Sequence, residues 1–488
     1  MRVILAEKPS VAQSIAAVLG ADQKKNGYLQ GENDLVSWCI GHLIELAPPE
    51  IYDARYAKWR REDLPIVPSA WESVVSDGTK KQFAVLKDLL NRTDVDEVVC
   101  ATDAGREGEL IFRMVYEKTG CTKPVKRLWI SSLEESAIRD GFRSLKPGTA
   151  YDALYRAALC RAQADWLVGI NGTRLYSRLY GTKLNVGRVM TPTLAMVAQR
   201  EKEIAAFQVE RFYTAQLSCG FPAQSGRIKT REEAERIRAS CHCKKAAVKQ
   251  IERRQKKEKP PKLYDLTALQ RDANRIYGYT AQQTLDYAQT LYEKKLATYP
   301  RTDSRFLTHD LRDRLPALIE CVAQVLPFAS GLPLAVHTQQ VIRDEKVSDH
   351  HAIIPTQNMT REALAQLPMG ERSILTLLAV RLLAATGEPC ETDEVTVTLD
   401  CEGHDFTAKG STVRQMGYRV FEETFRGSLG SRERKEQEYP IPPLEIGQMV
   451  GPVVATIREG QTTPPKRYTD VIFCERKEWI GIEERSSA

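Results

Sequence analysis

Three acidic residues in the first quarter of the chain have the spacing of a metal or phosphate site. Asp103 and Glu107 lie four residues apart, where an apolar run passes into a helix-like run, with Gly105 and Gly108 beside them. Carboxylate oxygens are the ligands that Mg²⁺ prefers, and Mg²⁺ often bridges to a substrate phosphate. The alternative is a helix whose first turn carries acids only because they interact favourably with its dipole. Glu7, which follows another apolar run, favours the metal site.

A tyrosine in the second half of the chain is a candidate nucleophile. Tyr299 begins the segment YPRTDS at 299–304. A free phenol has a pKa of about 10, so an attacking phenolate at neutral pH needs cationic help worth about 4 kcal/mol. Arg301 and Lys8 could supply that charge. The alternative is a core tyrosine at a turn made by Pro300, and this segment taken alone favours that alternative.

Two adjacent histidines, His350 and His351, precede a second apolar run. No cysteine lies near them and no third ligand stands at metal spacing, so the pattern does not predict a zinc site. His350 is a candidate phosphate contact or general acid, with Asp349 fixing its tautomer. Because adjacent side chains usually point apart, we expect His351 to pack or to cap.

The elements that must position these side chains follow from apolar spacing. Residues 2–6 and 95–101 are short apolar runs, and each leads into a helical period, at 11–19 and at 110–116. Strand, tight turn and helix in this order are typical of a parallel α/β sheet, whose carboxyl edge would then carry the acids. The first 150 residues are therefore predicted to form one α/β domain.

The rest of the chain alternates between helical and β patterns. Residues 151–204 have helical spacing and many arginines, and an alternating pattern begins near residue 210. A helical block at 265–385 is followed by further alternation, which predicts a helical module inserted into a β domain. The basic run RRQKKEKPPK at 253–262 is either a solvated connector or a strap that contacts phosphates.

Composition excludes several classes of protein. The 488 residues are enough for several domains, and no apolar run approaches the roughly 20 residues of a membrane span. No secretory or transit signal is recognised at the start, so we expect a cytoplasmic protein. The eleven cysteines include no C-x-x-C pair, which argues against a disulfide framework or a zinc ribbon. Without a P-loop or a G-x-S-x-G elbow, an ATP motor or a serine hydrolase is not predicted.

Taken in order, these segments resemble the type IA DNA topoisomerases, and most closely the bacterial topoisomerase III group. The resemblance covers about residues 1–470. It is carried by seven segments: AEKPS at 6–10, GHL at 41–43, ATDAGREGE at 101–109, NVGRV at 185–189, YDLTALQ at 264–270, TYPRTDS at 298–304 and DHHAIIPT at 349–356.

The resemblance implies a multidomain fold of α/β, α and β domains, in which a Toprim domain joins a toroidal type IA core with a hole able to hold DNA. The expected domains are a Toprim domain at 1–150, a helical DNA-gripping domain at 151–205 with 450–488, a β-rich arch at 206–264 with 386–449, and a helical domain carrying the nucleophile at 265–385.

The resemblance also implies a reaction. Tyr299 would attack a phosphodiester of single-stranded or underwound DNA, leaving a 5'-phosphotyrosyl link, and religation after strand passage would relax negative supercoils or decatenate DNA without ATP. Arg301 and Lys8 would stabilise charge on the phosphate. The remaining roles are these: Glu7 as proton carrier; Glu7, Asp103 and Glu107 as the Mg²⁺ site; His350 as a phosphate contact; Arg161, Gln163, Asp165 and Arg188 as DNA contacts. We expect a monomer that works without a membrane, in the nucleoid or encoded on a mobile element.

Two departures from the family pattern keep alternatives open. Gly105 stands where the D-x-D-x-E signature has its second aspartate, so one metal carboxylate is absent. After residue 470 the family continues with further helices, whereas residues 471–488 follow another pattern, and we expect a truncated DNA-gripping domain. The alternatives are a Toprim nuclease or primase, which has no use for Tyr299, and a relic that binds single-stranded DNA without cutting it.

Overall fold

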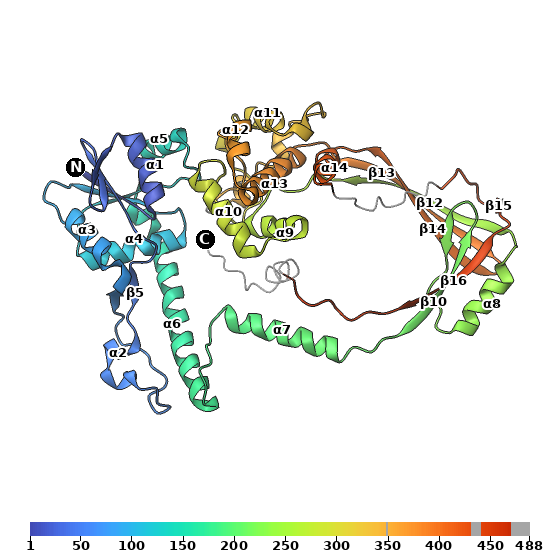
Figure 1. Ribbon diagram of the computed structural model, residues 1–488, viewed down its shortest axis with the longest axis horizontal. Helices are drawn as coiled ribbons and strands as arrows, with labels where there is room; N and C mark the ends of the chain where they lie inside the picture. The colour runs from blue at the N-terminus through green and yellow to red at the C-terminus, as the bar shows by residue number, and fades with distance from the viewer. Residues whose placement is uncertain (348–349, 431–440, 470–488) are drawn as a thin grey trace.

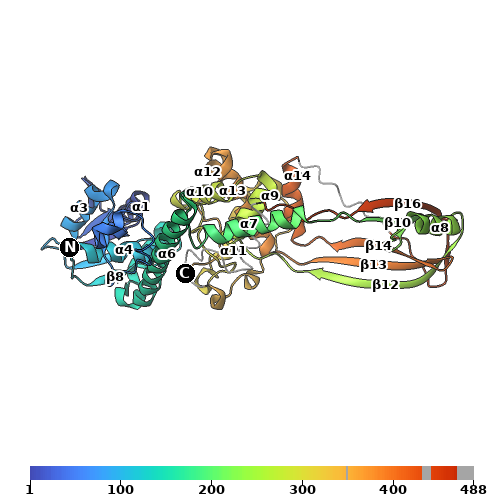
Figure 2. The same ribbon diagram turned by 90° about the horizontal axis from the view of Figure 1, so that it is seen from below.

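The structure is a computed structural model that describes residues 1–347, 350–430 and 441–469. Asp349 and the tail at 470–488, both named above, lie outside these residues. The described elements follow one another around an open centre (Figure 1), from the first sheet through α6 (Asp152–Tyr180) and α7 (Met190–Ala205) to a second sheet and a helical module. Figure 2 shows the second sheet extending away from that module as long strands. No described helix combines the length and apolar character needed to cross a membrane.

The first sheet has a parallel centre. Strand β1 (Arg2–Ala6) lies between β4 (Asp34–Trp38) and β7 (Glu97–Ala101), and β8 (Val125–Arg127) extends the parallel set beyond β7. Val3 to Ala6 are fully buried, which explains their continuous apolar run, because a central parallel strand is covered on both faces. Three short antiparallel strands complete the sheet: β2 (Gln23–Lys25), β3 (Tyr28–Gln30) and β9 (Lys146–Pro147).

Helices follow the strands as predicted. Helix α1 (Pro9–Leu19) begins with a proline, whose missing N–H costs nothing in the first turn. The other helices of this unit are α3 (Lys80–Leu90), α4 (Arg106–Thr119) and α5 (Glu135–Arg143). An arm made of β5 (Ile44–Leu46), α2 (Pro49–Tyr52) and β6 (Ser73–Val75) leaves the sheet and packs on α6, where Trp166 Nε1 donates to Ala47 O at 3.0 Å.

The second sheet is antiparallel throughout and corrects two expectations. Its strands, in spatial order, are β15 (Met449–Val450), β12 (Ala246–Glu258), β13 (Cys390–Cys401), β14 (His404–Gln415), β11 (Pro222–Gln224), β10 (Arg211–Ser218) and β16 (Val454–Gln461), with α8 (Arg231–Cys241) packed against them. The prediction that 450–488 is helical is wrong for 454–461, because β16 pairs with β10 along its whole length.

Most of the basic run at 253–262 is not a connector, and only residues 259–262 lie outside a strand or helix. Residues 253–258 belong to β12, and acids of β13 lie opposite its cations. Lys257 Nζ is 3.0 Å from Glu391, and Lys256 Nζ is 3.4 Å from Glu394. Cross-strand pairs of opposite charge stabilise an exposed sheet, so this run is explained by the sheet itself. Because these lysines are paired with acids, fewer cations of the run are left to contact phosphates.

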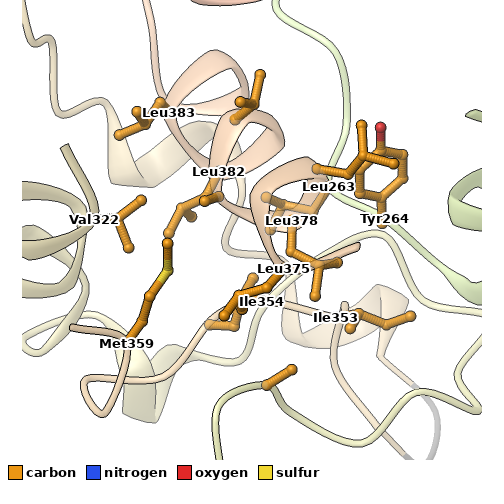
Figure 3. Close-up of a cluster of buried hydrophobic side chains, with 14 of the residues drawn as sticks. Leu263, Tyr264, Val322, Ile353, Ile354, Met359, Leu375, Leu378, Leu382 and Leu383 are labelled. Carbon is orange, nitrogen blue, oxygen red and sulfur yellow. The ribbon is translucent and has the colours of Figure 1, made fainter. Parts of the chain in front are cut away.

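The helical module has a core of its own. Helices α9 (Leu266–Tyr277), α10 (Ala281–Glu293), α11 (Leu315–Val325) and α12 (Arg361–Gln366) surround α13 (Met369–Ala385), which is buried over most of its length. Figure 3 shows Leu375, Leu378 and Leu382 of α13 facing Ile354 and other buried side chains. Helix α14 (Arg419–Ser428) contributes Phe421 and Phe425 to this core, so its assignment to the β-rich arch is wrong.

Candidate active site

The carboxyl ends of neighbouring parallel strands bring the acids together. Ala6 and Ala101 are paired residues of β1 and β7, so Glu7 and the Thr102-Asp103 turn leave the sheet side by side. The Asp103 N–H donates to Glu7 Oε2 at 3.2 Å. The expected meeting of these acids at the sheet edge is therefore observed.

Burial and mutual repulsion control the charge of these two acids. Burial, followed by the Asp103 charge, raises the pKa of Glu7 from 4.5 to about 7. Burial also raises the pKa of Asp103, against the opposing effect of Lys8 and of a hydrogen bond from the Tyr299 hydroxyl. Two carboxylates that are costly to ionise together favour a cation between them.

Glu107 takes a different partner. Its Oε2 lies 3.5 Å from His42 Nε2, and the hydrogen bond with His42 is the main cause that lowers the pKa of Glu107. Within the described ranges, no three His, Cys, Asp or Glu side chains are arranged as a metal site. Glu7 and Asp103 thus face each other in this conformation, whereas Glu107 faces the histidine.

The nucleophile candidate reaches this edge through a paired loop. After α10, Ala297 forms an antiparallel bridge with Pro355, and the Thr298 N–H donates to Ile354 O at 3.0 Å. Thr302 Oγ1 donates to His350 O at 2.8 Å. These bonds join the Tyr299 and His350 segments, which are some fifty residues apart in sequence, into one unit.

Tyr299 is buried against the acids. It is 7% exposed, and its hydroxyl is close enough to the Asp103 carboxylate to help lower the pKa of that acid. Burial first, then the charges of Asp103 and Glu7, raise the pKa of Tyr299 well above its usual value, and Arg301 lowers it only in part. The expected cationic activation is therefore outweighed in this closed state. The hydroxyl nevertheless faces carboxylates, as a proton donor.

His350 is held between the two units. Its ring is 2% exposed and its centroid lies 4.3 Å from that of Tyr299. Its Nε2 contacts the carbonyl of Ala104, so this nitrogen must carry the proton, and Nδ1 accepts from Ser131 Oγ at 3.0 Å. Burial lowers the pKa of His350 to about 3, so the ring is neutral. Among the described residues, Ser131 and Ala104 set the tautomer of His350.

His351 is also buried, with its Nδ1 2.7 Å from Ala352 O, in line with its expected packing role.

Lys8 is paired across the same interface. Its Nζ is 3.2 Å from Glu293 Oε1, at the end of α10, and its charge also acts on Glu7 and Asp103. Arg301 is close enough to lower the pKa of the same two acids. Both cations therefore lie near the acid pair, and Lys8 is held by the Glu293 carboxylate.

Of the four residues expected to contact DNA, only some lie near one another. On α6, Arg161 and Asp165 are four residues apart and share a face, and the charge of Arg161 acts on Glu107. Arg188 Nε donates to Asp165 Oδ1 at 2.8 Å. Gln163 lies two residues from each neighbour, so helical geometry turns it away from that face.

Three residues at the site were not singled out from the sequence. His42 follows β4, and its place in the segment GHL is the signal that could have found it. Ser131 follows β8 and accepts the Tyr299 N–H at its carbonyl, at 3.1 Å. Glu293 lies six residues before the tyrosine, and no local pattern indicates its pairing with Lys8.

Comparison with known proteins agrees with this geometry. Residues 149–475 match the DNA topoisomerase family and residues 2–133 match the Toprim domain. A DNA topoisomerase 3 of Bacillus cereus is 41% identical over 491 residues, covering 98% of this chain and 67% of that protein. The chain belongs to the type IA DNA topoisomerases, in the DNA topoisomerase 3 group.

Further relatives support the same assignment. DNA topoisomerase 3 of Bacillus subtilis (strain 168) is 41% identical over 482 residues, covering 96% of this chain and 66% of that protein. Full-length topoisomerase I from Thermotoga maritima superposes with a TM-score of 0.74 at 23% identity, over 99% of this chain and 76% of that chain, which is a likeness of fold. The predicted Toprim domain and type IA core are thereby confirmed. The chain spans about two thirds of the length of its DNA topoisomerase 3 relatives.

Family membership also fixes the general chemistry. Type IA topoisomerases are isomerases that act on DNA and need no ATP, and the Toprim domain is a metal-binding fold. A Toprim nuclease or primase is therefore not supported as an alternative.

The raised pKa of Glu7 predicts a pH-dependent stability in metal-free buffer. The folded protein holds the proton more tightly than the unfolded chain, so the stability from protonated Glu7 is fully present below pH 4.5 and is lost as the pH rises through about 7. Relative to the wild type, Glu7→Gln should therefore gain up to about 3 kcal/mol between pH 5 and pH 8. Urea unfolding in EDTA at several pH values measures this difference, and a constant offset would contradict it.

Proposed function

We propose that this topoisomerase cleaves one DNA strand by attack of the Tyr299 oxygen on a phosphodiester. The phenolic proton passes to the Asp103 carboxylate, whose pKa the nearby Tyr299 hydroxyl helps to lower. A bond forms between Tyr299 Oη and phosphorus, and the bond to the 3' oxygen breaks. Glu7, whose pKa of about 7 suits a proton carrier at neutral pH, protonates the leaving 3' oxygen. The observation that carries this proposal is the buried contact of Tyr299 with Asp103 beside Glu7.

Positive side chains complete the site. Lys8 and Arg301 act on the two acids and are placed to bind the phosphate once DNA replaces Glu293 as the partner of Lys8. Because the new phosphotyrosyl bond stores the energy of the broken one, religation needs no other energy source. His350 binds the phosphate after it leaves Ala104 and Ser131.

The acid pair fits a divalent metal ion. Mg²⁺ keeps several waters and is commonly bound by only one or two carboxylates, which matches a buried Glu7 and Asp103 whose ionised forms repel each other. Glu107 would join them by leaving His42. A bound Mg²⁺ supplies positive charge for orienting a DNA phosphate. Gly105 supplies no carboxylate, so we propose one ion.

Strand passage requires the closed interface to part. A side chain that is 7% exposed cannot meet a phosphate, so DNA entry must separate the helical module from the sheet edge. The contacts that must break are Lys8 with Glu293, the Tyr299 N–H with Ser131, His350 with Ala104, and Arg314 with Asp140. The covalent link would keep the cut strand attached while a second strand passes.

The substrate we propose is single-stranded or underwound DNA. This is supported by Arg161 on α6, whose charge acts on Glu107, and by Arg188, which pairs with Asp165 of the same helix; contacts of such cations to phosphates tolerate any sequence. We propose a monomer that relaxes negative supercoils or decatenates DNA in the bacterial cytoplasm. The domains proposed are the four given above, with β16 moved to the arch and α14 to the helical module.

End-labelled single-stranded oligonucleotides test the proposal. With Mg²⁺ and a denaturing quench, the 3'-labelled fragment should become attached to the protein, and the 5'-labelled fragment should be released with a free 3'-hydroxyl. Attachment of the 5' label, or cutting without attachment, would refute the chemistry. Binding without cutting, together with no relaxation of supercoiled plasmid, would instead support the DNA-binding relic.

A further inference from the structure

Arg127 lies beneath the turn that carries Asp103. It is the last residue of β8 and its side chain is fully buried. Its Nη1 donates to Thr102 O at 2.8 Å and Cys100 O at 3.1 Å, and its Nη2 donates to Asp103 O at 2.7 Å. A fourth bond goes to Leu128 O, at 2.8 Å. One rigid guanidinium therefore holds the backbone of two neighbouring strand ends.

The charge of Arg127 is balanced by a second buried residue. Glu109, on α4, is 1% exposed, and its Oε2 lies 3.2 Å from Arg127 Nε. Its other oxygen accepts from Arg113 Nε at 2.9 Å, and Arg113 in turn donates to Asp152 at 2.8 Å. Burying such a pair is a poor way to gain stability, since apolar residues of similar volume often do as well or better. A geometric role accounts better for its presence.

The turn held by Arg127 supplies three separate parts of the site. The Asp103 carboxylate lies beside Tyr299, the Asp103 N–H donates to Glu7, and the carbonyl of the next residue, Ala104, contacts His350. A shift of this turn would change all three contacts at once. Groups behind metal ligands commonly set the orientation of those ligands in this way.

We propose that Arg127, whose charge Glu109 balances, is a positioning residue that aims the Asp103 carboxylate toward Glu7 for metal binding. This rests on the proposed metal role of Asp103 and Glu7. Arg127 touches neither substrate nor metal, and it acts through its bonds to the carbonyls of Thr102 and Asp103 and through its charge, which also lowers the pKa of Asp103. A lysine in its place would keep the charge but would lack the planar fork that reaches the carbonyls of Cys100, Thr102 and Asp103 together.

Binding of Mn²⁺ to the DNA-free full chain tests this inference. Glu109→Gln keeps the shape of the side chain, removes its charge and loosens Arg127, so the Mn²⁺ affinity measured by calorimetry should fall about tenfold. Arg127→Lys should lower the Mn²⁺ affinity at least as much. If Glu109→Gln fails to fold, the Arg127→Lys variant decides the test. Binding of a single-stranded oligonucleotide in EDTA should stay within about twofold of the wild type.

The same sheet offers a matched control. Arg2 donates from Nε and Nη2 to the Asp34 carboxylate at 2.8 and 3.1 Å, and Asp34 is 7% exposed. This pair lies at the opposite edge of the sheet, at the start of β1 and β4. Asp34→Asn should lower the melting temperature to a similar degree and leave the Mn²⁺ affinity unchanged.

The outcomes separate this inference from the proposed function. Wild-type Mn²⁺ affinity in Glu109→Gln and Arg127→Lys would overturn the positioning role while leaving the metal site intact. If Asp34→Asn lowered the Mn²⁺ affinity by the same factor, the loss would reflect general destabilisation. That result would also overturn the positioning role of Arg127. No Mn²⁺ binding by the wild type, or no loss in Asp103→Ala, would overturn the metal site itself and the inference with it.

Discussion

Tyr299→Phe is expected to lower the rate of DNA strand cleavage by at least about four orders of magnitude, because no other hydroxyl replaces a missing nucleophile. The substitution removes one oxygen and leaves the ring, which packs between Tyr292 and His350. Losing the interaction of this one hydroxyl with Asp103 should change the free energy of unfolding by only about 1–3 kcal/mol. Adduct formation on a 3'-labelled oligonucleotide, quenched with detergent, measures the rate.

Tyr292→Phe is the matched control for this substitution. Tyr292 is equally buried, lies in the same cluster with its ring centroid 5.4 Å from that of Tyr299, and also has its pKa raised by burial. The Tyr299 hydroxyl is one of the groups that lower the pKa of Asp103, whereas the pKa of Tyr292 itself is raised by burial and by the charges of Asp103, Glu7 and Glu293. The Tyr292→Phe variant should therefore still form the adduct. An adduct that persists in Tyr299→Phe, or disappears equally in Tyr292→Phe, would disprove the assignment of the nucleophile.

Gly108→Ala should have the second largest effect on cleavage. It should also destabilise the protein, although helix propensity alone would predict that it stabilises α4. Alanine usually stabilises a helix by about 1 kcal/mol over glycine. A Cβ on Gly108, however, would lie 2.0 Å from Asp103 O, so the turn or the helix must move. We expect a loss of about 1–3 kcal/mol in stability, as for other overpacked sites, and a fall in Mg²⁺-dependent cleavage of roughly 100-fold from the displaced carboxylate. Thermal unfolding and adduct formation measure the two effects.

Gly105→Ala provides the comparison within the same turn. A Cβ on Gly105 meets no atom within 4 Å, and its φ of 171° is extended backbone that any residue adopts. The melting temperature of the Gly105→Ala variant should therefore stay close to that of the wild type. If both alanine variants were equally stable and equally active, the close approach at Gly108 would not constrain the Asp103 turn.

Local patterns in the sequence were sufficient to predict the elements that carry the chemistry. The apolar run before Glu7 and the one before Asp103 each predict a buried strand, because only a strand covered on both faces has no polar alternation. Glycine near Asp103 and helical spacing after it predict the turn into α4. Parallel strands that end at one edge then bring these two acids together without further information.

Only the tertiary structure decided which partners the charged groups take. Lys8 meets Glu293, Glu107 meets His42, and Arg127 is buried beneath a turn that begins 25 residues before it. The basic run at 253–258 became a strand because β13, more than 130 residues further along, supplies acids beside it. Periodicity reports which face of an element is buried, whereas these pairings depend on how distant elements close on one another. That closure is set by the packing of whole cores, which no local window of sequence contains.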